Sequence, residues 1–255
     1  MTPPRVHTMP VTLTALDVDF TERWRPSAIL TAMEKCATEH AELLGYGRDA
    51  LLSRQLIWVM SRTHVRMDRY PVLNDQVLLR TWAYPPNRFF YPRCHVFETP
   101  QGEWLGAAST LWLAIDLAAR QVVAPARAAL PSPPDVSDIA LPLPVPDRVT
   151  RLPGPADETV RLPVYSDLDV NGHVNNARYV DWLCDSLPLH VHKARAIHNL
   201  LINYTKEILP STPVRCTLCL QENAFSMLGE ARDGGQVFFE AGGDLMPCAQ
   251  THPGL

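Results

Sequence analysis

The sequence lacks any long hydrophobic run. Although 46% of its 255 residues are hydrophobic, no stretch reaches the roughly 18 consecutive apolar residues that a membrane span requires. Residues 1–20 contain neither the apolar segment of a secretory signal nor an Arg- and Ser-rich transit leader. We therefore expect no contact with a membrane and a cytoplasmic location.

An excess of positive charge is also absent. The chain has 23 Lys and Arg against 27 Asp and Glu, a net charge of −4, which argues against a general nucleic-acid binder. Charged residues make up 20% of the chain, an ordinary value for a soluble globular protein. The length suits one large domain or two small ones.

The cysteine motifs are incomplete. Cys216 and Cys219 form a CxxC, but no second pair follows at the spacing of a metal site. Residues three apart in a strand face opposite sides. Without a secretory signal, we expect the six cysteines to be reduced thiols. We therefore predict no metal and no cofactor.

A polar segment with catalytic potential begins at Ser166 and reads SDLDVNGHVNN. Its Asp169, Asn171 and His173 stand at alternate positions, and in an extended segment alternate side chains point the same way. We therefore expect a carboxylate, an amide and an imidazole to line one wall. Gly172 would let a ligand approach the backbone closely.

A helix is predicted directly after this segment. Apolar residues recur at helical spacing, at Ala177, Val180, Leu183, Cys184 and Leu187. Asn175 or Asn176 can cap the first turn. Because free N–H groups at a helix start favour negative charge, those around Val174 and Asn175 are candidates for an oxyanion hole. A simple helix-capping turn explains the same spacing equally well.

The first half is predicted to contain one long helix followed by an antiparallel meander. The helix begins at Pro26 and ends before Gly45. Strand-like runs follow at 55–67, 76–83, 88–98 and 104–116. A sheet wrapped in this way around one helix is the outline of a hotdog fold.

A proline-rich stretch separates the two halves. Residues 125–155 hold nine of the 24 prolines, which cannot occupy the interior of a regular sheet. We interpret 125–156 as a semi-stiff linker. An ordered loop packed along the sheet is the alternative.

The second half repeats the plan of the first. A strand near 159–165 precedes the polar segment and its helix, and strand-like runs follow at 196–209, 214–221, 224–230 and 236–240. The Asp-x-Asp pairs at 17–19 and 167–169 stand in the same relation to the two helices, with Thr21 and Arg23 in the places of Asn171 and His173. We therefore predict an α+β tandem double hotdog, with a non-catalytic first unit at 1–124 and a catalytic second unit at 157–255.

The segment D-x-N-x-H-V-N-N at 169–176 resembles the active-site hallmark of the acyl-acyl carrier protein (acyl-ACP) thioesterases, a double hotdog family of plants and bacteria. Every position of the hallmark is matched. Blocks of the first half are similar to the same family, including WVMSR at 58–62, RTW at 80–82 and ASTLW at 108–112. The resemblance extends over nearly the whole chain.

This resemblance implies a thioester hydrolase that converts fatty acyl-ACP to free fatty acid and ACP in lipid metabolism. The implied partner is ACP, which carries the acyl chain on its phosphopantetheine arm. A double hotdog pairs its two halves within one chain, so we expect a monomer or a homodimer.

Thioester hydrolysis needs a positioned water, a base and donors for the carbonyl oxygen. Asp169 can orient or deprotonate the water, Asn171 can hold it, and His173 can donate a proton to the leaving thiolate. The resemblance adds Glu207, because YTKE at 204–207 corresponds to a tyrosine-basic-basic-Glu block of the plant relatives. A surface salt bridge with neighbouring lysine is the alternative for Glu207, and the choice of base between the two carboxylates stays open.

A cysteine nucleophile is not expected. Plant relatives often place Cys directly after the glutamate, and this chain has Ile208 there. Cys184 stands among apolar positions of the predicted helix, which is typical of a core thiol. We therefore predict hydrolysis by activated water.

The acyl chain requires an apolar pocket, which we place in the first unit. The candidate lining residues are Met33, Trp58, Met60 and Trp112, and plain core packing is the alternative for each. An acidic carrier protein would dock on basic surface, for which Arg88, Arg93 and Arg178 are among the candidates.

Three other functions compete with ACP-dependent hydrolysis. A hotdog thioesterase acting on acyl-CoA could use an aspartate at the place of Asp169. A hotdog hydratase or dehydratase also uses a histidine and an acid, but the Asp-x-Asn-x-His spacing does not resemble its site. A non-catalytic acyl- or ACP-binding module would not need Asp169, Asn171, His173 and Glu207 together.

Overall fold

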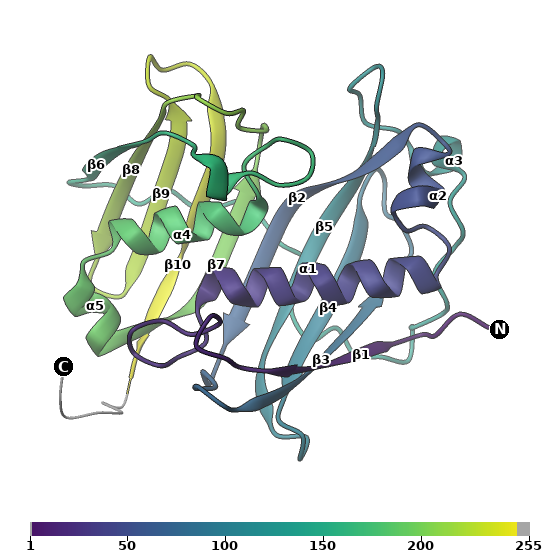
Figure 1. Cartoon of the computed structure of the whole chain (residues 1–255), viewed down its shortest axis with the longest axis horizontal. Coiled ribbons are helices and arrows are strands. Elements are labelled where there is room, and N and C mark those ends of the chain that lie inside the picture. The colour runs from purple at the N-terminus through teal and green to yellow at the C-terminus, as the bar shows by residue number, and fades with distance from the viewer. Residues whose placement is uncertain (1, 249–255) are drawn as a thin grey trace.

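One ten-stranded antiparallel sheet forms the body of the protein (Figure 1). The structure is a computed structural model that describes residues 2–248, so residues 1 and 249–255 of the predicted units lie outside the described residues. The strand order is β1-β3-β4-β5-β2-β7-β10-β9-β8-β6. The strands span β1 His7–Thr12, β2 Leu56–Met67, β3 Gln76–Ala83, β4 Tyr91–Glu98, β5 Trp104–Asp116, β6 Asp157–Arg161, β7 Arg195–Tyr204, β8 Val214–Gln221, β9 Ala224–Ala231 and β10 Val237–Pro247.

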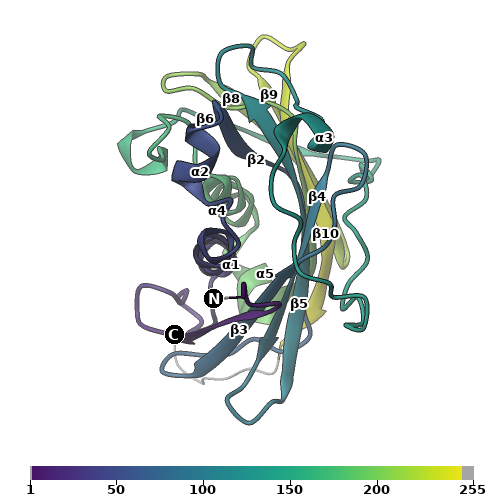
Figure 2. The ribbon, with the colours of Figure 1, turned by 90° about the vertical axis from the view of Figure 1, so that its right-hand side faces the viewer.

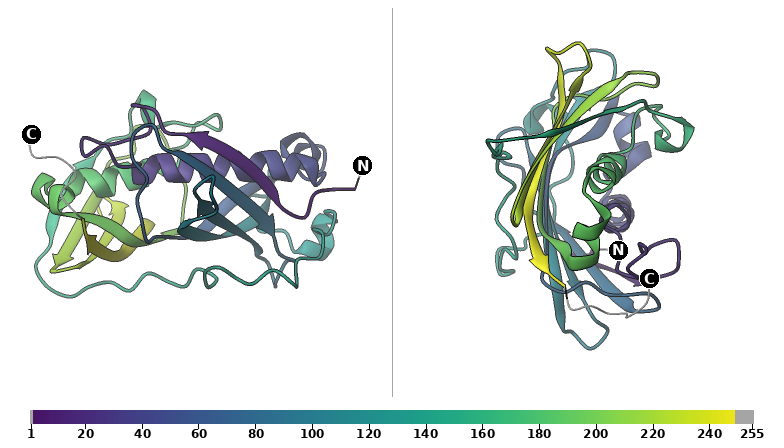
Figure 3. Two further views of the ribbon diagram at one scale, coloured as in Figure 1. Left: turned by 90° about the horizontal axis from the view of Figure 1, so that it is seen from below. Right: turned by 90° about the vertical axis from the view of Figure 1, so that its left-hand side faces the viewer.

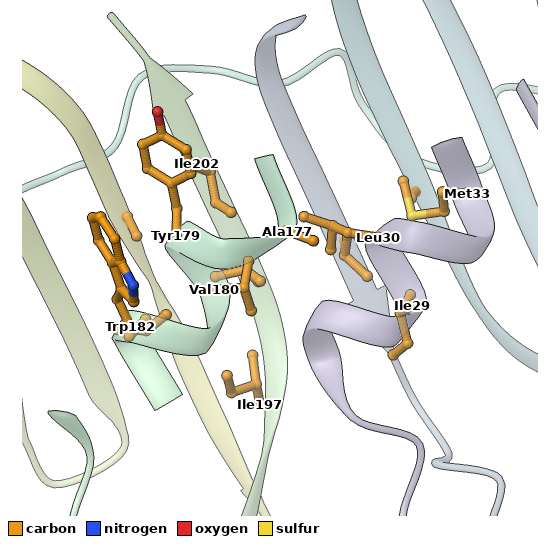
Figure 4. Packing of buried hydrophobic residues seen from close by; sticks show 14 of the residues in the cluster. Ile29, Leu30, Met33, Ala177, Tyr179, Val180, Trp182, Ile197 and Ile202 are labelled. Carbon is orange, nitrogen blue, oxygen red and sulfur yellow. The ribbon is translucent and has the colours of Figure 1, made fainter. Parts of the chain in front are cut away.

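The two longest helices, α1 (Pro26–Leu43) and α4 (Asn176–Ser186), lie next to each other on the concave face of the sheet (Figure 2). Helix α1 begins with proline, which has no backbone N–H. At the first position of a helix this group would have no intrahelical partner, so proline loses no hydrogen bond there. Leu30 of α1 and Ala177 of α4 meet in the shared core, and Val180 packs toward Ile197 of β7 (Figure 4). Burying one Leu, Ile or Val side chain stabilises the fold by about 1.5–3 kcal/mol.

The halves are joined by strand pairing. β2 and β7 pair antiparallel from Arg62 opposite Asn203 to Arg66 opposite Asn199, which makes the sheet continuous. This arrangement confirms the predicted α+β double hotdog.

Several element boundaries differ from the sequence prediction. β4 begins at Tyr91 rather than at 88, β7 ends at Tyr204 rather than at 209, and β10 is longer than predicted. β1 and the short helices α2 (Arg48–Leu52) and α5 (Leu189–Ala194) were not expected, because short segments lack a clear period. No helix within residues 2–248 is long and apolar enough to cross a membrane.

The proline-rich segment packs along the sheet, in agreement with the alternative interpretation. After α3 (Pro125–Ala128) it runs over the face opposite the helices (Figure 3). Val136 and Leu143 are buried there in one cluster with Trp82 and Cys94, and the Ser109 hydroxyl donates to the Pro144 carbonyl at 2.6 Å. The segment therefore covers apolar residues that the first half of the sheet would otherwise expose.

Candidate active site

The polar segment forms a tight turn, so the expectation of an extended chain is wrong. The Asp169 N–H donates to the His173 carbonyl at 2.8 Å, and the Gly172 N–H donates to the Asp169 carbonyl at 3.0 Å. Gly172 has a φ of 75°, a conformation that glycine adopts at no steric cost. Asp169, Asn171 and His173 are close because the chain folds back on itself between Leu168 and Val174.

The Asp169 carboxylate organises this turn. Its Oδ1 accepts the backbone N–H of Asn171 at 2.8 Å and that of His173 at 3.3 Å. Its Oδ2 accepts the Asn171 amide at 3.3 Å. Hydrogen bonds to an ionised acceptor are roughly twice as strong as neutral ones, so Asp169 fixes the positions of the other two side chains.

The start of α4 confirms one prediction and corrects another. Asn175 caps the helix, accepting the Ala177 N–H at 2.9 Å. The Val174 N–H, however, donates to the Ile208 carbonyl at 3.0 Å, and the Asn175 N–H donates to the Asp167 carbonyl at 2.8 Å. Because both groups are already bonded, the expectation that they form an oxyanion hole is not supported.

Glu207 lies beside His173, in the loop after β7 rather than in the strand. Its Oε2 is 3.5 Å from the His173 Nε2. The bond from Val174 to Ile208 holds this loop against the start of α4. Lys206, the alternative partner of Glu207, has its Nζ 3.4 Å from the Gln236 amide oxygen instead.

Sequence reasoning missed Arg120, which also pairs with Glu207. Arg120 follows β5 in the first half and stands 87 positions before its partner. No local pattern relates residues so far apart. The carboxylate therefore lies between an imidazole from the second half and a guanidinium from the first.

Glu34 of α1 is a second missed residue, and the sequence does contain a signal for it. It stands in the apolar stripe of Leu30, Ala37 and Ala41, where a charge is unusual. Burial raises the pKa of its carboxyl, and the nearby Asp169 carboxylate raises it further. Glu34 thus brings a third carboxyl group close to the motif turn.

We expect Glu34→Gln to stabilise the protein at neutral pH. A carboxyl whose pKa is higher in the folded state binds more protons there, so stability is lost as the pH rises above the ordinary value of 4.5. Glutamine removes this loss. Urea unfolding should show a more stable variant at about pH 7 and a smaller difference at about pH 4. A difference that is the same at both pH values would contradict this prediction.

An apolar cavity of about 470 Å³ opens beside the turn. Its wall includes Val170 and Asn171 of the turn and Glu34 of α1. Aromatic and aliphatic side chains provide much of the remaining surface, among them Ala37, Tyr46, Leu51, Trp58, Tyr91 and Trp112. The cavity therefore connects the motif to the interior of the first half.

Two of the four predicted lining residues lie on this wall and two do not. Trp58 and Trp112 border the cavity. Met33 and Met60, which are 2% and 6% exposed, are buried and are not among the residues that border the cavity, so their assignment gains no support. Arg93 also lines the cavity and is 6% exposed, which corrects its placement among the surface charges.

The first half contains a copy of the motif turn. The Asp19 N–H donates to the Arg23 carbonyl at 2.9 Å, and the Asp19 carboxylate accepts the Thr21 N–H at 2.7 Å. Asp169 makes the same two contacts with His173 and Asn171. The structure therefore shows Thr21 and Arg23 at the places that the sequence repeat gave them.

The two copies differ beyond the turn. The Trp24 N–H donates to the Pro71 carbonyl just as that of Val174 donates to Ile208, which puts Tyr70 at the place of Glu207. The Arg23 guanidinium donates to backbone carbonyls of α5 and β7, including that of Arg195 at 3.3 Å. The first copy thus keeps the turn but lacks the imidazole and the second carboxylate.

The cysteines lie away from the motif. Cys184 borders a different cleft, which includes Asp19 and Arg23, and burial raises the pKa of its thiol well above the ordinary value. Cys216 is buried in the main core, whereas the Cys219 thiol contacts the Pro153 carbonyl at 3.6 Å. Among residues 2–248 no group of three or more His, Cys, Asp or Glu could hold a metal ion.

Two family models match the chain. The acyl-ACP thioesterase N-terminal domain matches residues 4–127, and the acyl-ACP thioesterase C-terminal domain matches residues 156–241. Together they cover most of the sequence.

Curated relatives come from plants and are named chloroplastic. The palmitoyl-acyl carrier protein thioesterase of Cuphea hookeriana is 25% identical over 82% of this chain and 55% of its own length. The dodecanoyl-[acyl-carrier-protein] hydrolase of Cinnamomum camphora is 27% identical over 71% of this chain and 50% of its own length. The chain spans about half the length of these relatives.

Solved structures share the fold over most of the chain. An acyl-ACP thioesterase from Bacteroides thetaiotaomicron has a TM-score of 0.84 at 22% identity, covering 95% of this chain and 98% of its own. The 12:0-ACP thioesterase from Umbellularia californica has a TM-score of 0.80 at 21% identity, covering 96% and 98%.

Proposed function

Because the chain belongs to the acyl-ACP thioesterase family, we propose that it hydrolyses fatty acyl-ACP thioesters to free fatty acid and ACP. The observation that supports this proposal is the pairing of Glu207 with His173 beside a turn that borders an apolar cavity. The cavity offers space for an acyl chain, and the pair offers a base and a proton donor next to the turn that borders the cavity. The family and the names of the curated relatives support ACP as the carrier.

In this proposal Glu207 is the base that activates water. Asp169 already accepts three hydrogen bonds within the turn, whereas Glu207 faces two cationic or proton-donating partners, His173 and Arg120. A water held between Glu207 and the Asn171 amide would lose a proton to Glu207 as its oxygen attacks the thioester carbon.

The carbon–sulfur bond breaks in the second step. The tetrahedral oxyanion collapses to the carboxylic acid, and the phosphopantetheine sulfur leaves with the bonding electron pair. His173 can relay to the thiolate the proton that Glu207 took from the water, so that both side chains return to their starting protonation states. Side chains and one water account for every atom, so the proposal includes no cofactor or metal.

We assign Asp169 and Arg120 positioning roles. Asp169 holds the backbone of Asn171 and His173, and Arg120 limits the orientation of the Glu207 carboxylate.

Strands β2 and β7 pair antiparallel, so the two hotdog units contact each other within one chain. This supports a site whose residues all come from one subunit, whether the protein is a monomer or a homodimer.

The test is a comparison of thioesters of the same acyl chain on ACP and on CoA. A thiol reagent measures the release of the carrier, and mass spectrometry identifies the free acid. We expect a higher kcat/KM on ACP. A higher value on CoA would favour the acyl-CoA alternative, and acyl binding without release of thiol would favour a binding module.

We expect Cys184→Ala to retain most of the wild-type turnover. Cys184 does not border the cavity beside the motif, and its raised pKa keeps the thiol protonated and therefore unreactive. Thiol release under steady-state conditions measures the effect. Loss of nearly all turnover in a variant with an unchanged unfolding curve would contradict the activated-water mechanism.

A further inference from the structure

A buried cation lines the cavity that we assign to the acyl chain. Arg93 of β4 is 6% exposed and borders the same cavity as Asn171. A guanidinium stays protonated in proteins, and burying a charge without an opposite partner is costly. If the substrate were an unsubstituted fatty acyl group, the Arg93 guanidinium would face only methylene groups.

The groups packed around Arg93 are neutral. Its Nη1 donates to the His40 Nδ1 at 2.9 Å and to the Thr81 hydroxyl at 3.2 Å. The His40 Nε2 is 3.0 Å from the Pro4 carbonyl, to which it can donate only as N–H, leaving Nδ1 as the acceptor for Arg93. Burial lowers the pKa of His40 to about 4, so the imidazole adds no charge near neutral pH.

The remaining titratable neighbours do not compensate the charge either. Burial raises the pKa values of the Cys36 and Cys94 thiols to about 12 and also raises that of the Tyr46 phenol. Burial and Arg93 itself keep the pKa of His95 well below its ordinary value. Within residues 2–248, no carboxylate forms an ion pair with Arg93, and the nearby Glu39 is paired with His7 at 2.9 Å.

An unpartnered hydroxyl lies on the same wall. The Tyr91 hydroxyl is buried without a hydrogen-bond partner among the described residues. Tyr91 borders the cavity and packs its ring edge-on against Trp58, with 4.7 Å between ring centroids. Only Nη1 of Arg93 has a hydrogen bond among the described contacts. The cavity wall thus holds donors that the protein itself leaves unused.

We propose that the acyl group carries an oxygen function at its distal end, a carboxylate above all, which Arg93 and the Tyr91 hydroxyl bind. This inference rests on the proposed function, because it assigns the specificity of the same cavity. A carboxylate matches the guanidinium in charge and in its paired donor geometry, and the aromatic and aliphatic wall accommodates the methylene chain between the two ends.

Helix α1 gives the scale of such a substrate. Glu34, which lies near Asp169, and His40, which contacts Arg93, are six residues apart on this helix. A rise of 1.5 Å per residue separates them by about 9 Å along the axis. A chain of medium length therefore spans the distance from the motif to Arg93, whereas a butanoyl chain does not.

The test uses three ACP thioesters of equal length: octanoyl, ω-hydroxyoctanoyl and the ω-carboxy chain, with butanoyl as a short control. For the wild type we expect kcat/KM to be highest for the ω-carboxy chain, exceeding octanoyl by about 10- to 100-fold, as a charge-assisted hydrogen bond would give. Arg93→Met should reverse this order, and its urea unfolding curve shows whether the variant folds. Arg93→Lys should restore part of the preference for the ω-carboxy chain.

The outcomes separate this inference from the function on which it rests. Equal or faster hydrolysis of octanoyl by the wild type overturns the inference and leaves the thioesterase intact. If Arg93→Met loses butanoyl turnover through misfolding, Arg93→Lys decides, because retained activity without the ω-carboxy preference also overturns it. No hydrolysis of any thioester, butanoyl included, would instead reject the proposed function.

Discussion

Replacing Glu207 with glutamine is expected to lower kcat by about 10²–10⁴-fold, the usual contribution of a positioned general base. Glutamine keeps the size and hydrogen-bonding reach of the side chain but cannot accept a proton from water. The fold should persist, because Glu207 is partly exposed in a loop that backbone bonds hold in place. Thiol release at saturating acyl-ACP measures the effect, and KM should change little.

Glu103→Gln is the matched control for this change. Glu103 is also a partly exposed glutamate paired with an arginine, Arg69, at 2.8 Å, and it lies outside the cavity wall and the motif turn. Its replacement should leave kcat within about twofold of the wild type. Similar rates for the Glu207 and Glu103 variants would show that Glu207 is a surface ion pair and would leave Asp169 as the candidate base.

Asp169→Asn is expected to lower both stability and turnover. The ionised carboxylate accepts two backbone N–H groups and the Asn171 amide, and each hydrogen bond to a charged group is worth about 1.5–3 kcal/mol. An asparagine can orient only one acceptor oxygen toward these donors, so Asn171 and His173 should shift. A displacement of about 1 Å in a catalytic group costs about 10²-fold in rate.

The duplicated turn at Asp19 provides a control for Asp169. Asp19 accepts the corresponding N–H and hydroxyl groups of Thr21 in a turn of the same geometry. Asp19→Asn should therefore lose comparable stability in urea unfolding while kcat stays close to the wild-type value. Equal losses of turnover in the two variants would mean that the turns act only through stability and would remove Asp169 from the site.

Local patterns in the sequence were sufficient for the regular elements. The stripe of apolar residues from Ile29 onward predicts α1, and the strand-like runs at 76–83 and 104–116 predict β3 and β5, whose bounds coincide with the structure. Asn175 was recognisable as a helix cap because that interaction spans only two residues. The equivalence of the turns at Asp19 and Asp169 was also visible, since each turn is built from bonds within four residues.

The geometry of the polar segment was misjudged even though its residues were identified. Alternation of Asp169, Asn171 and His173 was attributed to an extended chain, whereas the side chain of Asp169 bonds to its own backbone and closes a turn. Asp and Asn commonly compete in this way with regular structure. The backbone groups assigned to an oxyanion hole were taken up by contacts that the sequence does not reveal.

By itself, the sequence determined the helices, most strands, the duplication and the identity of the motif residues, because each depends on side chains a few positions apart. Only the tertiary structure decided which groups meet: Glu207 with His173 and Arg120, Glu34 with Asp169, and Arg93 with a cavity instead of solvent. These contacts join residues tens of positions apart through the register of β2 on β7 and the packing of α1 against α4. Register and helix packing arise from the whole buried surface at once, and no short segment of the chain encodes them.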